Sequence, residues 1–341
     1  MKIKKMMAIV NPNSGRKRGM KCYEELIAWR DGAAKETGIE VEVVLTDKSE
    51  ERNTTALAER AVREGYDLIL VVGGDGTVNE VANGIRGSDI PLLIACAGNG
   101  NDFGRALGSP GEINEVVDLI SHGQIRSVDL MEVNGRIGVN ILGIGGIDTR
   151  VVEYVEGTLK KKCGFIPPNL LYLVGLLREI LRVRIKYPCL KLEVQEQGLP
   201  ARIMEGEVTL LAVGNGPTCG GIFRLTPDAD LTDGKVDICW IRKTGRIRIL
   251  ENIIKATKGT HLEMPEVETL PDRTLPRLTS FIVSSFEFLP AELDGETIPP
   301  AKEFKITVIP QGMKVLVPPS ILVAQRPLLV KTVKASELQL A

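Results

Sequence analysis

The first third of the chain alternates short apolar runs with stretches in which apolar residues recur at helical spacing. Strongly apolar strands separated by helices are typical of a parallel sheet that is covered on both faces. The predicted strands are 6–10, 39–45, 67–72 and 90–95, and the predicted helices are 19–35, 54–63, 78–85 and 113–122. The pattern therefore predicts an α/β domain with a parallel sheet over residues 1–125.

Beyond residue 126 the pattern changes, because strand-like runs follow one another directly. The predicted strands are 127–133, 137–144, 190–195, 208–213, 236–241, 281–288 and 304–317, with helices at 149–162, 170–184 and 246–258. Runs of strands after an α/β segment indicate a separate β-rich domain. We assign this domain to residues 126–317 and leave 318–341 as a C-terminal tail, for which packing back on the first domain is one option.

Composition and charge narrow the class of protein. The chain has 341 residues, which suggests two domains, and its net charge of −1 does not indicate a nucleic-acid partner. Its six cysteines are scattered and it has only two histidines, so we expect a reducing compartment and no zinc cluster. The apolar stretches 6–10 and 165–177 are too short for a signal peptide and for a membrane span, respectively. We therefore expect a cytoplasmic protein, at most peripheral to the inner membrane surface.

The strongest chemical signal is the sequence Gly-Gly-Asp-Gly-Thr at residues 73–77, between an apolar strand and a predicted helix. Glycines let the backbone approach a ligand closely, and free N–H groups at a helix start favour a phosphate. Asp75 can hold a cation or a hydroxyl, and Thr77 can donate to phosphate. A turn without a ligand is the alternative, but ligands bind at the carboxyl ends of parallel strands in such folds.

Two more loops follow strands at the same end of the predicted sheet. Residues 10–16 read Val-Asn-Pro-Asn-Ser-Gly-Arg, and residues 97–105 read Ala-Gly-Asn-Gly-Asn-Asp-Phe-Gly-Arg. Taken alone, the first of these is as consistent with a capped turn as with a ligand site. Three such loops at one edge are harder to explain as turns, so together they predict a nucleotide site.

These motifs resemble the catalytic domain of the diacylglycerol kinases, in the family that also contains sphingosine and ceramide kinases and bacterial lipid kinases. The resemblance extends to Asn-Ile-Leu-Gly-Ile-Gly-Gly-Ile-Asp at 140–148, to Gly-Asn-Gly at 214–216 with the segment 220–234, and to Leu-Asp-Gly-Glu at 293–296. The order and spacing of these separate motifs make the resemblance specific. It implies a nucleotide site in a cleft between the α/β domain and a β-sandwich-like second domain.

The resemblance also implies which residues contact ATP. They are Asn11, Pro12, Asn13, Ser14, Gly15, Thr46, Gly74, Asp75, Gly76, Thr77, Val78, Asn79 and Glu80, with a further contact near Asn99. At Asn99 the chain departs from the family pattern, because an amide replaces the usual threonine hydroxyl. Phosphate contact at that loop is therefore an open question.

A magnesium site is implied at Asp230, Asp233 and the backbone carbonyl of Lys235. Two carboxylates on one turn and a carbonyl are hard oxygen ligands of the kind that Mg²⁺ prefers. Without the resemblance, an acidic β-turn would be the simpler interpretation of Asp-Leu-Thr-Asp-Gly at 230–234.

Glu296 is our candidate for the general base that takes the proton of the acceptor hydroxyl during phosphoryl transfer. Asp75 is the rival candidate, because it should lie near the phosphates. The alternative for Glu296 is a solvent-facing side chain after an Asp-Gly hairpin turn.

The apolar stretch 170–184 follows three lysines and carries Arg178, Arg182 and Arg184, with Lys186 just beyond. A basic, apolar helix can lie on an anionic membrane surface. A helix that packs in the second domain with solvated basic ends is the interpretation we favour, and transient membrane contact stays open.

The sequence thus predicts a two-domain lipid kinase that uses ATP and Mg²⁺, with diacylglycerol as the first choice of acceptor. Two alternatives remain: an NAD-kinase-like or other kinase of the superfamily, and a nucleotide-binding regulatory protein that has lost catalysis. The Asn-Pro-x-Ser-Gly and Asp-Gly-Glu elements favour the lipid branch, whereas only Asn99 supports loss of catalysis. The sequence identifies neither the lipid nor the oligomeric state.

Overall fold

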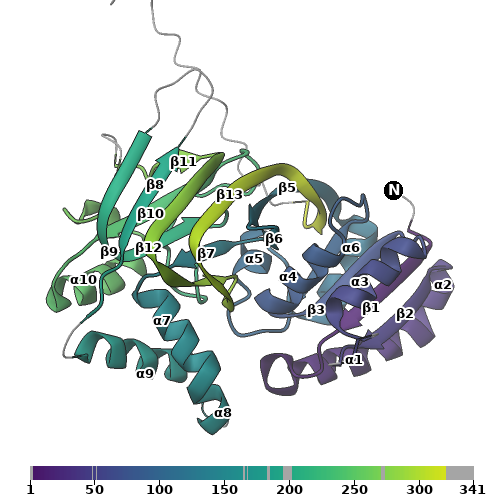
Figure 1. Ribbon diagram of the computed structural model, residues 1–341. Helices are drawn as coiled ribbons and strands as arrows, with labels where there is room; N and C mark the ends of the chain where they lie inside the picture. The colour runs from purple at the N-terminus through teal and green to yellow at the C-terminus, as the bar shows by residue number, and fades with distance from the viewer. Residues whose placement is uncertain are drawn as a thin grey trace, which may run out of the picture.

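The first domain contains a four-stranded parallel sheet with the order β4-β3-β1-β2 (Figure 1). The computed structural model describes residues 3–319 except 48, 51, 164–165, 167, 183–184, 195–201 and 270–272. The four strands are β1 (Lys5–Val10), β2 (Glu40–Leu45), β3 (Leu68–Gly73) and β4 (Leu92–Cys96). Their parallel pairing confirms the predicted class of the N-terminal domain.

Helices cover both faces of this sheet, and the alternation along β1 explains why. Met6, Ala8 and Val10 bury with residues of α1 (Arg18–Trp29) and α6 (Ile113–His122). Met7 and Ile9 point to the opposite face, where α3 (Thr54–Arg63) and α4 (Asp75–Gly84) pack. Because successive strand side chains alternate between faces, a strand covered on both sides must be apolar throughout.

The second domain is built from antiparallel strands around a separate core that includes the buried Trp240. The strands are β5 (Gln124–Val133), β6 (Arg136–Gly138), β7 (Ile141–Ile144), β8 (Cys189–Val194), β9 (Arg202–Gly214), β10 (Val236–Arg242), β11 (Arg277–Leu278), β12 (Ser280–Leu293) and β13 (Glu296–Val317). All of their pairings with one another are antiparallel. An α/β domain followed by a β-rich domain is therefore the observed architecture.

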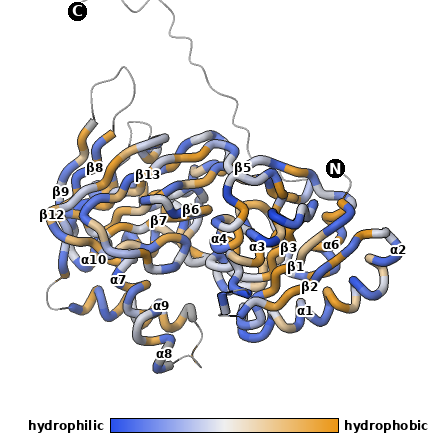
Figure 2. The backbone as a smooth tube through the Cα atoms, turned by 45° about the vertical axis from the view of Figure 1, so that its right-hand side comes forward, coloured by the Kyte–Doolittle hydropathy of each residue, from blue (hydrophilic) through white to orange (hydrophobic). Residues whose placement is uncertain are grey.

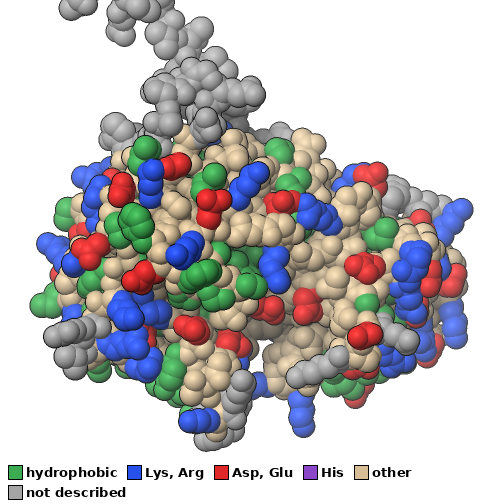
Figure 3. Space-filling model, in the orientation of Figure 1, with side chains coloured by type: hydrophobic (Ala, Val, Ile, Leu, Met, Phe, Trp, Pro, Cys, Tyr) green, Lys and Arg blue, Asp and Glu red, His purple; other side chains and the backbone are tan. Residues whose placement is uncertain are grey.

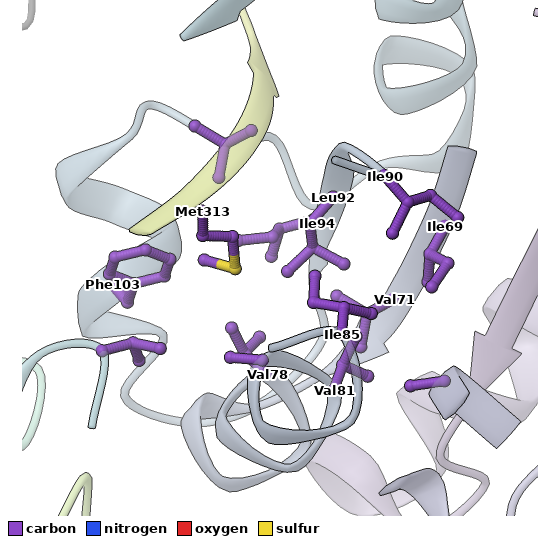
Figure 4. Close-up of a cluster of buried hydrophobic side chains, with 14 of the residues drawn as sticks. Ile69, Val71, Val78, Val81, Ile85, Ile90, Leu92, Ile94, Phe103 and Met313 are labelled. Atoms are coloured by element: carbon purple, nitrogen blue, oxygen red, sulfur yellow. The ribbon is translucent and has the colours of Figure 1, made fainter. Parts of the chain in front are cut away.

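The last strand, β13, joins the two domains. Its first half pairs with β12, and at its far end Val315 lies opposite Leu92 of β4. Met313, Val315 and Val317 belong to the core of the first domain, and Figure 4 shows Met313 pointing into that cluster beside Phe103. A single sheet path thus runs through both domains.

Helices flank the second domain on its outer side (Figures 1 and 2). They are α7 (Ile147–Tyr154), the turn η3 (Val155–Leu159), α8 (Lys160–Cys163), α9 (Pro168–Leu181) and α10 (Arg246–Ala256). Short turns η1 (Ser14–Lys17), η2 (Arg30–Ala34) and η4 (His261–Glu263) and the brief α2 (Lys35–Thr37) complete the helical segments. Within the described residues, no helix has the length and apolarity to cross a membrane.

Some predicted boundaries were wrong. The single strand predicted at 137–144 is two strands, β6 and β7, because the backbone N–H groups of Val139, Asn140 and Ile141 turn to the carboxylate of Asp294. The helix predicted at 78–85 begins at Asp75, so the Asp-Gly-Thr segment forms its first turn. The helix predicted at 19–35 is interrupted at Gly32. Most of the predicted tail 318–341 lies outside the described residues.

Candidate active site

The three loops singled out in the sequence meet at the carboxyl ends of β1, β3 and β4. The side-chain amide of Asn11 donates to Oγ1 of Thr77 at 3.0 Å. The backbone N–H groups of Ala97 and Gly98 donate to the carbonyl of Gly73 at 2.9 and 3.1 Å. The loops thus brace one another, as expected for a preformed ligand site.

Glycine is required where these loops touch. A Cβ on Gly15 would lie 2.1 Å from the carbonyl oxygen of Ala97, and one on Gly98 would lie 2.4 Å from Cα of Gly74. Gly15 also has a φ of 54°, which favours glycine. A side chain at either position would therefore push the loops apart.

The start of α4 completes the cradle. Gly74 is its N-cap, and no side chain caps the free N–H groups. Uncapped N–H groups and the partial positive charge of a helix start favour an anion such as a phosphate. Gly76 and Thr77 lie in this first turn, and the side chains of Thr77 and Val78 are both buried.

The remaining predicted contacts of the first domain surround this cradle. Asn13 donates its backbone N–H to Oδ1 of Asn11, and the N–H of Ser14 donates to the Asn11 carbonyl. Thr46 follows β2 and donates its N–H to the carbonyl of Val10. Pro12 lies in the same turn as Asn13, and Asn99 is exposed on the loop between β4 and α5 (Asp102–Ala106).

Asp75 and Asp102 form a close pair of carboxyl groups. A Cβ on Gly100 would lie 2.8 Å from Oδ2 of Asp75 and 3.2 Å from Oδ2 of Asp102. Burial, followed by the charge of Asp102, raises the pKa of Asp75 to about 6. Asp102 also accepts the N–H of Gly221 at 3.0 Å and so ties the loop to the second domain. Sequence reasoning gave Asp102 no role, although it stands inside the third motif.

Glu296 reaches across from the second domain to the Gly-Gly-Asp-Gly-Thr loop. A Cβ on Gly76 would lie 2.4 Å from Oε1 of Glu296, so only glycine leaves room for this carboxyl group. Asn79, Glu80 and Glu296 line a cavity of about 290 Å³. The side chain of Glu296 is exposed, but partial desolvation at the cavity, then the charges of Glu80 and Glu156, raise its pKa above the usual value.

Asp294 fixes the turn that carries Glu296. It is 5% exposed, and its two carboxylate oxygens accept the N–H groups of Val139, Asn140 and Ile141 at 2.8–2.9 Å. Oδ2 also accepts the side-chain amide of Asn79 at 2.6 Å, from α4. Asp294 has a φ of 53° at this turn. The Asp-Gly-Glu motif therefore combines a structural aspartate with an accessible glutamate.

A second buried carboxyl group, Glu292, supports the same turn. Its Oε2 accepts the N–H of Gly295 at 2.8 Å. A Cβ on Gly143 would lie 3.0 Å from Oε1 of Glu292 and 2.5 Å from Oδ2 of Asp148, so the two acids are neighbours. Burial, followed by the charge of Asp148, raises the pKa of Glu292 to about 8. Glu292 lies just outside the Leu-Asp-Gly-Glu motif, and no role was predicted for it.

The predicted magnesium ligands lie elsewhere, in the segment 230–235 that directly precedes β10. Oδ1 of Asp230 accepts from the hydroxyl and N–H of Thr232, and Oδ1 of Asp233 accepts the N–H of Lys235. The other oxygen of Asp233 pairs with Arg277. The carboxylates suit Mg²⁺ chemically, but an ion must compete with Arg277 for Asp233. Among the described residues, no cluster of three or more His, Cys, Asp or Glu could hold a metal.

An uncapped helix start at the carboxyl ends of the strands, faced by a glutamate from the β-rich domain, is an arrangement that suits phosphoryl transfer. The chain matches the family described as diacylglycerol kinase catalytic domain over residues 5–133 and the YegS C-terminal NAD kinase beta sandwich-like domain over residues 144–317. The chain belongs to the diacylglycerol kinase family, and it is therefore a member of a kinase family.

Curated relatives support this assignment, and a solved structure shares the fold. A diacylglycerol kinase of Staphylococcus carnosus is 31% identical over 86% of this chain and 89% of its own length. One of Bacillus subtilis is 33% identical over 76% of this chain and 81% of its own. In fold, a putative diacylglycerol kinase from Bacillus anthracis superposes with a TM-score of 0.72 at 24% identity, over 94% of this chain and all of that one.

Proposed function

We propose that this chain is an ATP-dependent lipid kinase that transfers the γ-phosphate of ATP to the hydroxyl of a lipid alcohol, with diacylglycerol as the first choice. The observation that carries the proposal is the approach of Glu296 to Gly76. It brings a carboxyl group with a raised pKa next to an anion-binding helix start. Phosphoryl transfer needs this juxtaposition of a proton acceptor and a phosphate cradle.

In this proposal the residues at 11–15 and 74–80, with Thr46 and Asn99 at the rim, bind the nucleotide. Free N–H groups of the α4 start hold phosphate oxygens, and Thr77, braced by Asn11, keeps the loop in place. An amide such as that of Asn99 can still donate a hydrogen bond, so the departure from threonine does not by itself remove a phosphate contact.

Glu296 is our candidate for the base because it lies at the cavity and its raised pKa brings it closer to neutral pH. Asp75 is the rival. It accepts the N–H of Phe103 at 3.2 Å, and Asp102 lies beside it. These surroundings suit a residue that orients a phosphate-bound cation or the acceptor hydroxyl.

Mg²⁺ is proposed as the cation, because it neutralises phosphate charge in such reactions. Asp230, Asp233 and the carbonyl of Lys235 are the residues proposed to hold Mg²⁺. At that turn, Oδ2 of Asp233 can bind either the ion or Arg277, with which it is paired here.

The decisive experiment incubates the full chain with labelled ATP, Mg²⁺ and a panel of lipid alcohols in mixed micelles, followed by identification of the labelled product. A phosphorylated lipid that disappears in the Glu296→Gln variant supports the proposal. Labelled NAD phosphate, with NAD included in the panel, would instead support an NAD-kinase-like activity. Nucleotide binding without turnover on any acceptor would support a regulatory protein that has lost catalysis.

A further inference from the structure

The outward face of α9 is apolar along its length. Five side chains spaced as on one helix face are each between 44% and 73% exposed: Leu170, Leu173, Val174, Leu177 and Leu181. The opposite face is buried against α7, where Gly175 allows close packing on Val151 and Val155. α9 is thus apolar on both sides, although only one side packs against protein in the described part of the chain.

α10 repeats this arrangement next to α9. Ile249 and Ile253 pack inward, in a cluster with Ile180 of α9, whereas Ile247, Leu250 and Ile254 are 42–76% exposed on the outer face. Arg246 at the start of α10 donates to the carbonyl of Arg182 at the end of α9. An open hollow of about 530 Å³ lies at the start of α10, where Ile185, Tyr187 and Arg248 are among the residues that line it.

The same two segments are strongly basic in a chain whose net charge is only −1. Residues 160–186 and 243–258 hold Lys160, Lys161, Lys162, Arg178, Arg182, Arg184, Lys186, Lys243, Arg246, Arg248, Lys255 and Lys258, against the two acidic residues Glu179 and Glu251. Glu179 is buried and pairs with three arginines at once. Figure 3 shows Lys and Arg side chains gathered with apolar ones over this region, at the lower left.

We infer that the outward faces of α9 and α10 together form a surface that docks on an anionic lipid bilayer. Exposed leucine and isoleucine side chains enter the interface, while the flanking lysine and arginine side chains meet anionic head groups. α9 has 14 residues and is about 21 Å long, well short of the roughly 30 Å of a hydrocarbon core, so it lies along the surface. The inference does not depend on which lipid is the acceptor.

The proposed docking surface adjoins the candidate active site. Tyr172, on α9, donates to Glu156 at 2.7 Å, and Glu156 pairs with Lys160. Both Glu156 and Lys160 lie close enough to Glu296 to influence its charge. Figure 3 also shows a recess between the two halves of the molecule, with acidic side chains near its rim. A docked molecule would therefore hold this recess close to the lipid surface.

The test is co-sedimentation of the full chain with vesicles of phosphatidylglycerol and phosphatidylcholine in equal parts, and with phosphatidylcholine alone. We expect binding to the anionic vesicles only, weakened by high salt because charges are then screened. The paired substitutions Leu173→Gln and Leu177→Gln should lower partitioning about tenfold or more, since each leucine is about half exposed and glutamine keeps the helix. Ile254→Gln on α10 gives an independent second variant.

Val62→Gln is the matched control, because Val62 is an exposed apolar residue on a helix of the first domain. It should bind anionic vesicles like the unmodified chain. The inference is overturned if the unmodified chain does not bind anionic vesicles, or if the α9 and α10 variants bind them as well as the unmodified chain does. It is also overturned if Val62→Gln loses as much binding as those variants. A further contrary result would be a dimer in sedimentation velocity that the α9 and α10 substitutions dissociate. The apolar faces would then pack against a second copy of the chain. This assay needs no catalysis, so it can fail while the proposed kinase activity stands.

Discussion

Asp294→Asn tests whether the Asp-Gly-Glu turn is held by a buried carboxylate. Both oxygens of Asp294 are used: Oδ1 accepts from Asn140 and Ile141, and Oδ2 accepts from Val139 and Asn79. An asparagine offers one oxygen and one NH₂ group. In either orientation of the side chain, two of the four N–H donors would therefore face the NH₂ group, which cannot accept a hydrogen bond. Rotation of the side chain cannot relieve this conflict.

The magnitude follows from the number of bonds lost. A hydrogen bond to a charged group contributes about 1.5–3 kcal/mol, so two lost bonds should lower the free energy of unfolding by about 3–6 kcal/mol. In a domain of this size, each kcal/mol shifts Tm by about 2–4 °C, so we expect a fall of about 10 °C. Thermal unfolding followed by tryptophan fluorescence measures it, since Trp240 is buried in the second domain.

Asp67→Asn is the matched control. Asp67 also accepts two backbone N–H groups, those of Lys4 and Lys5, but both bonds go to Oδ2. An asparagine can present its single oxygen there, so Tm should change by no more than about 2 °C. If Asp294→Asn shifts Tm as little as Asp67→Asn does, the turn is not held as we argue.

Four further predictions follow from the site. Glu296→Gln should lower kcat by roughly 10²–10⁴ with little change in nucleotide affinity, and a near-normal kcat would move the role of base to Asp75. Gly76→Ala should displace Glu296 and lower kcat without loss of stability. The control Gly157→Ala has open space around its Cβ and should leave kcat unchanged. Equal kcat values in the two variants would contradict the prediction. Because burial raises the pKa of Glu292 to about 8 from 4.5, its neutral form stabilises the fold below pH 4.5, and this contribution, on the order of a few kcal/mol, is lost as the pH rises through 8. Urea unfolding of Glu292→Gln should therefore be flatter with pH than that of the unmodified chain, and parallel curves would contradict it. Asp233→Ala should weaken the Mg²⁺ dependence of activity, and an unchanged Mg²⁺ titration would leave the turn with a structural role only.

Much of the first domain could be predicted from its sequence, because local pattern decides it. Strands buried on both faces must be apolar throughout, and helices with one apolar face have a clear period, as 54–63 does. The glycine-rich loop at 73–77 was recognisable because positive helix-start charge and close backbone approach need specific residues. The loops beside it, at 10–16 and 97–105, were predictable because each of them also directly follows an apolar strand.

The parts that could not be predicted depend on contacts between distant segments. The break at 139–140 exists because Asp294 draws three backbone N–H groups toward it, and no local pattern announces such a partner. Asp102 and Glu292 acquire their surroundings in the same way, from Gly221 and Asp148. The strand 281–288 was predicted too short, because the irregular pairing after Ser284 interrupts the alternation before β12 continues to Leu293.

The return of β13 to the first domain has a consequence for the order in which the protein matures on the ribosome. The segment that supplies Met313, Val315 and Val317 to the core around Ile94 is among the last of the described chain to be synthesised. Domains generally fold in the order in which they emerge. Here, the emerging first domain lacks these three side chains until the strands of the second domain have been synthesised. Its nascent form must keep an apolar site uncovered during that time, and it becomes complete only when the second domain has been made.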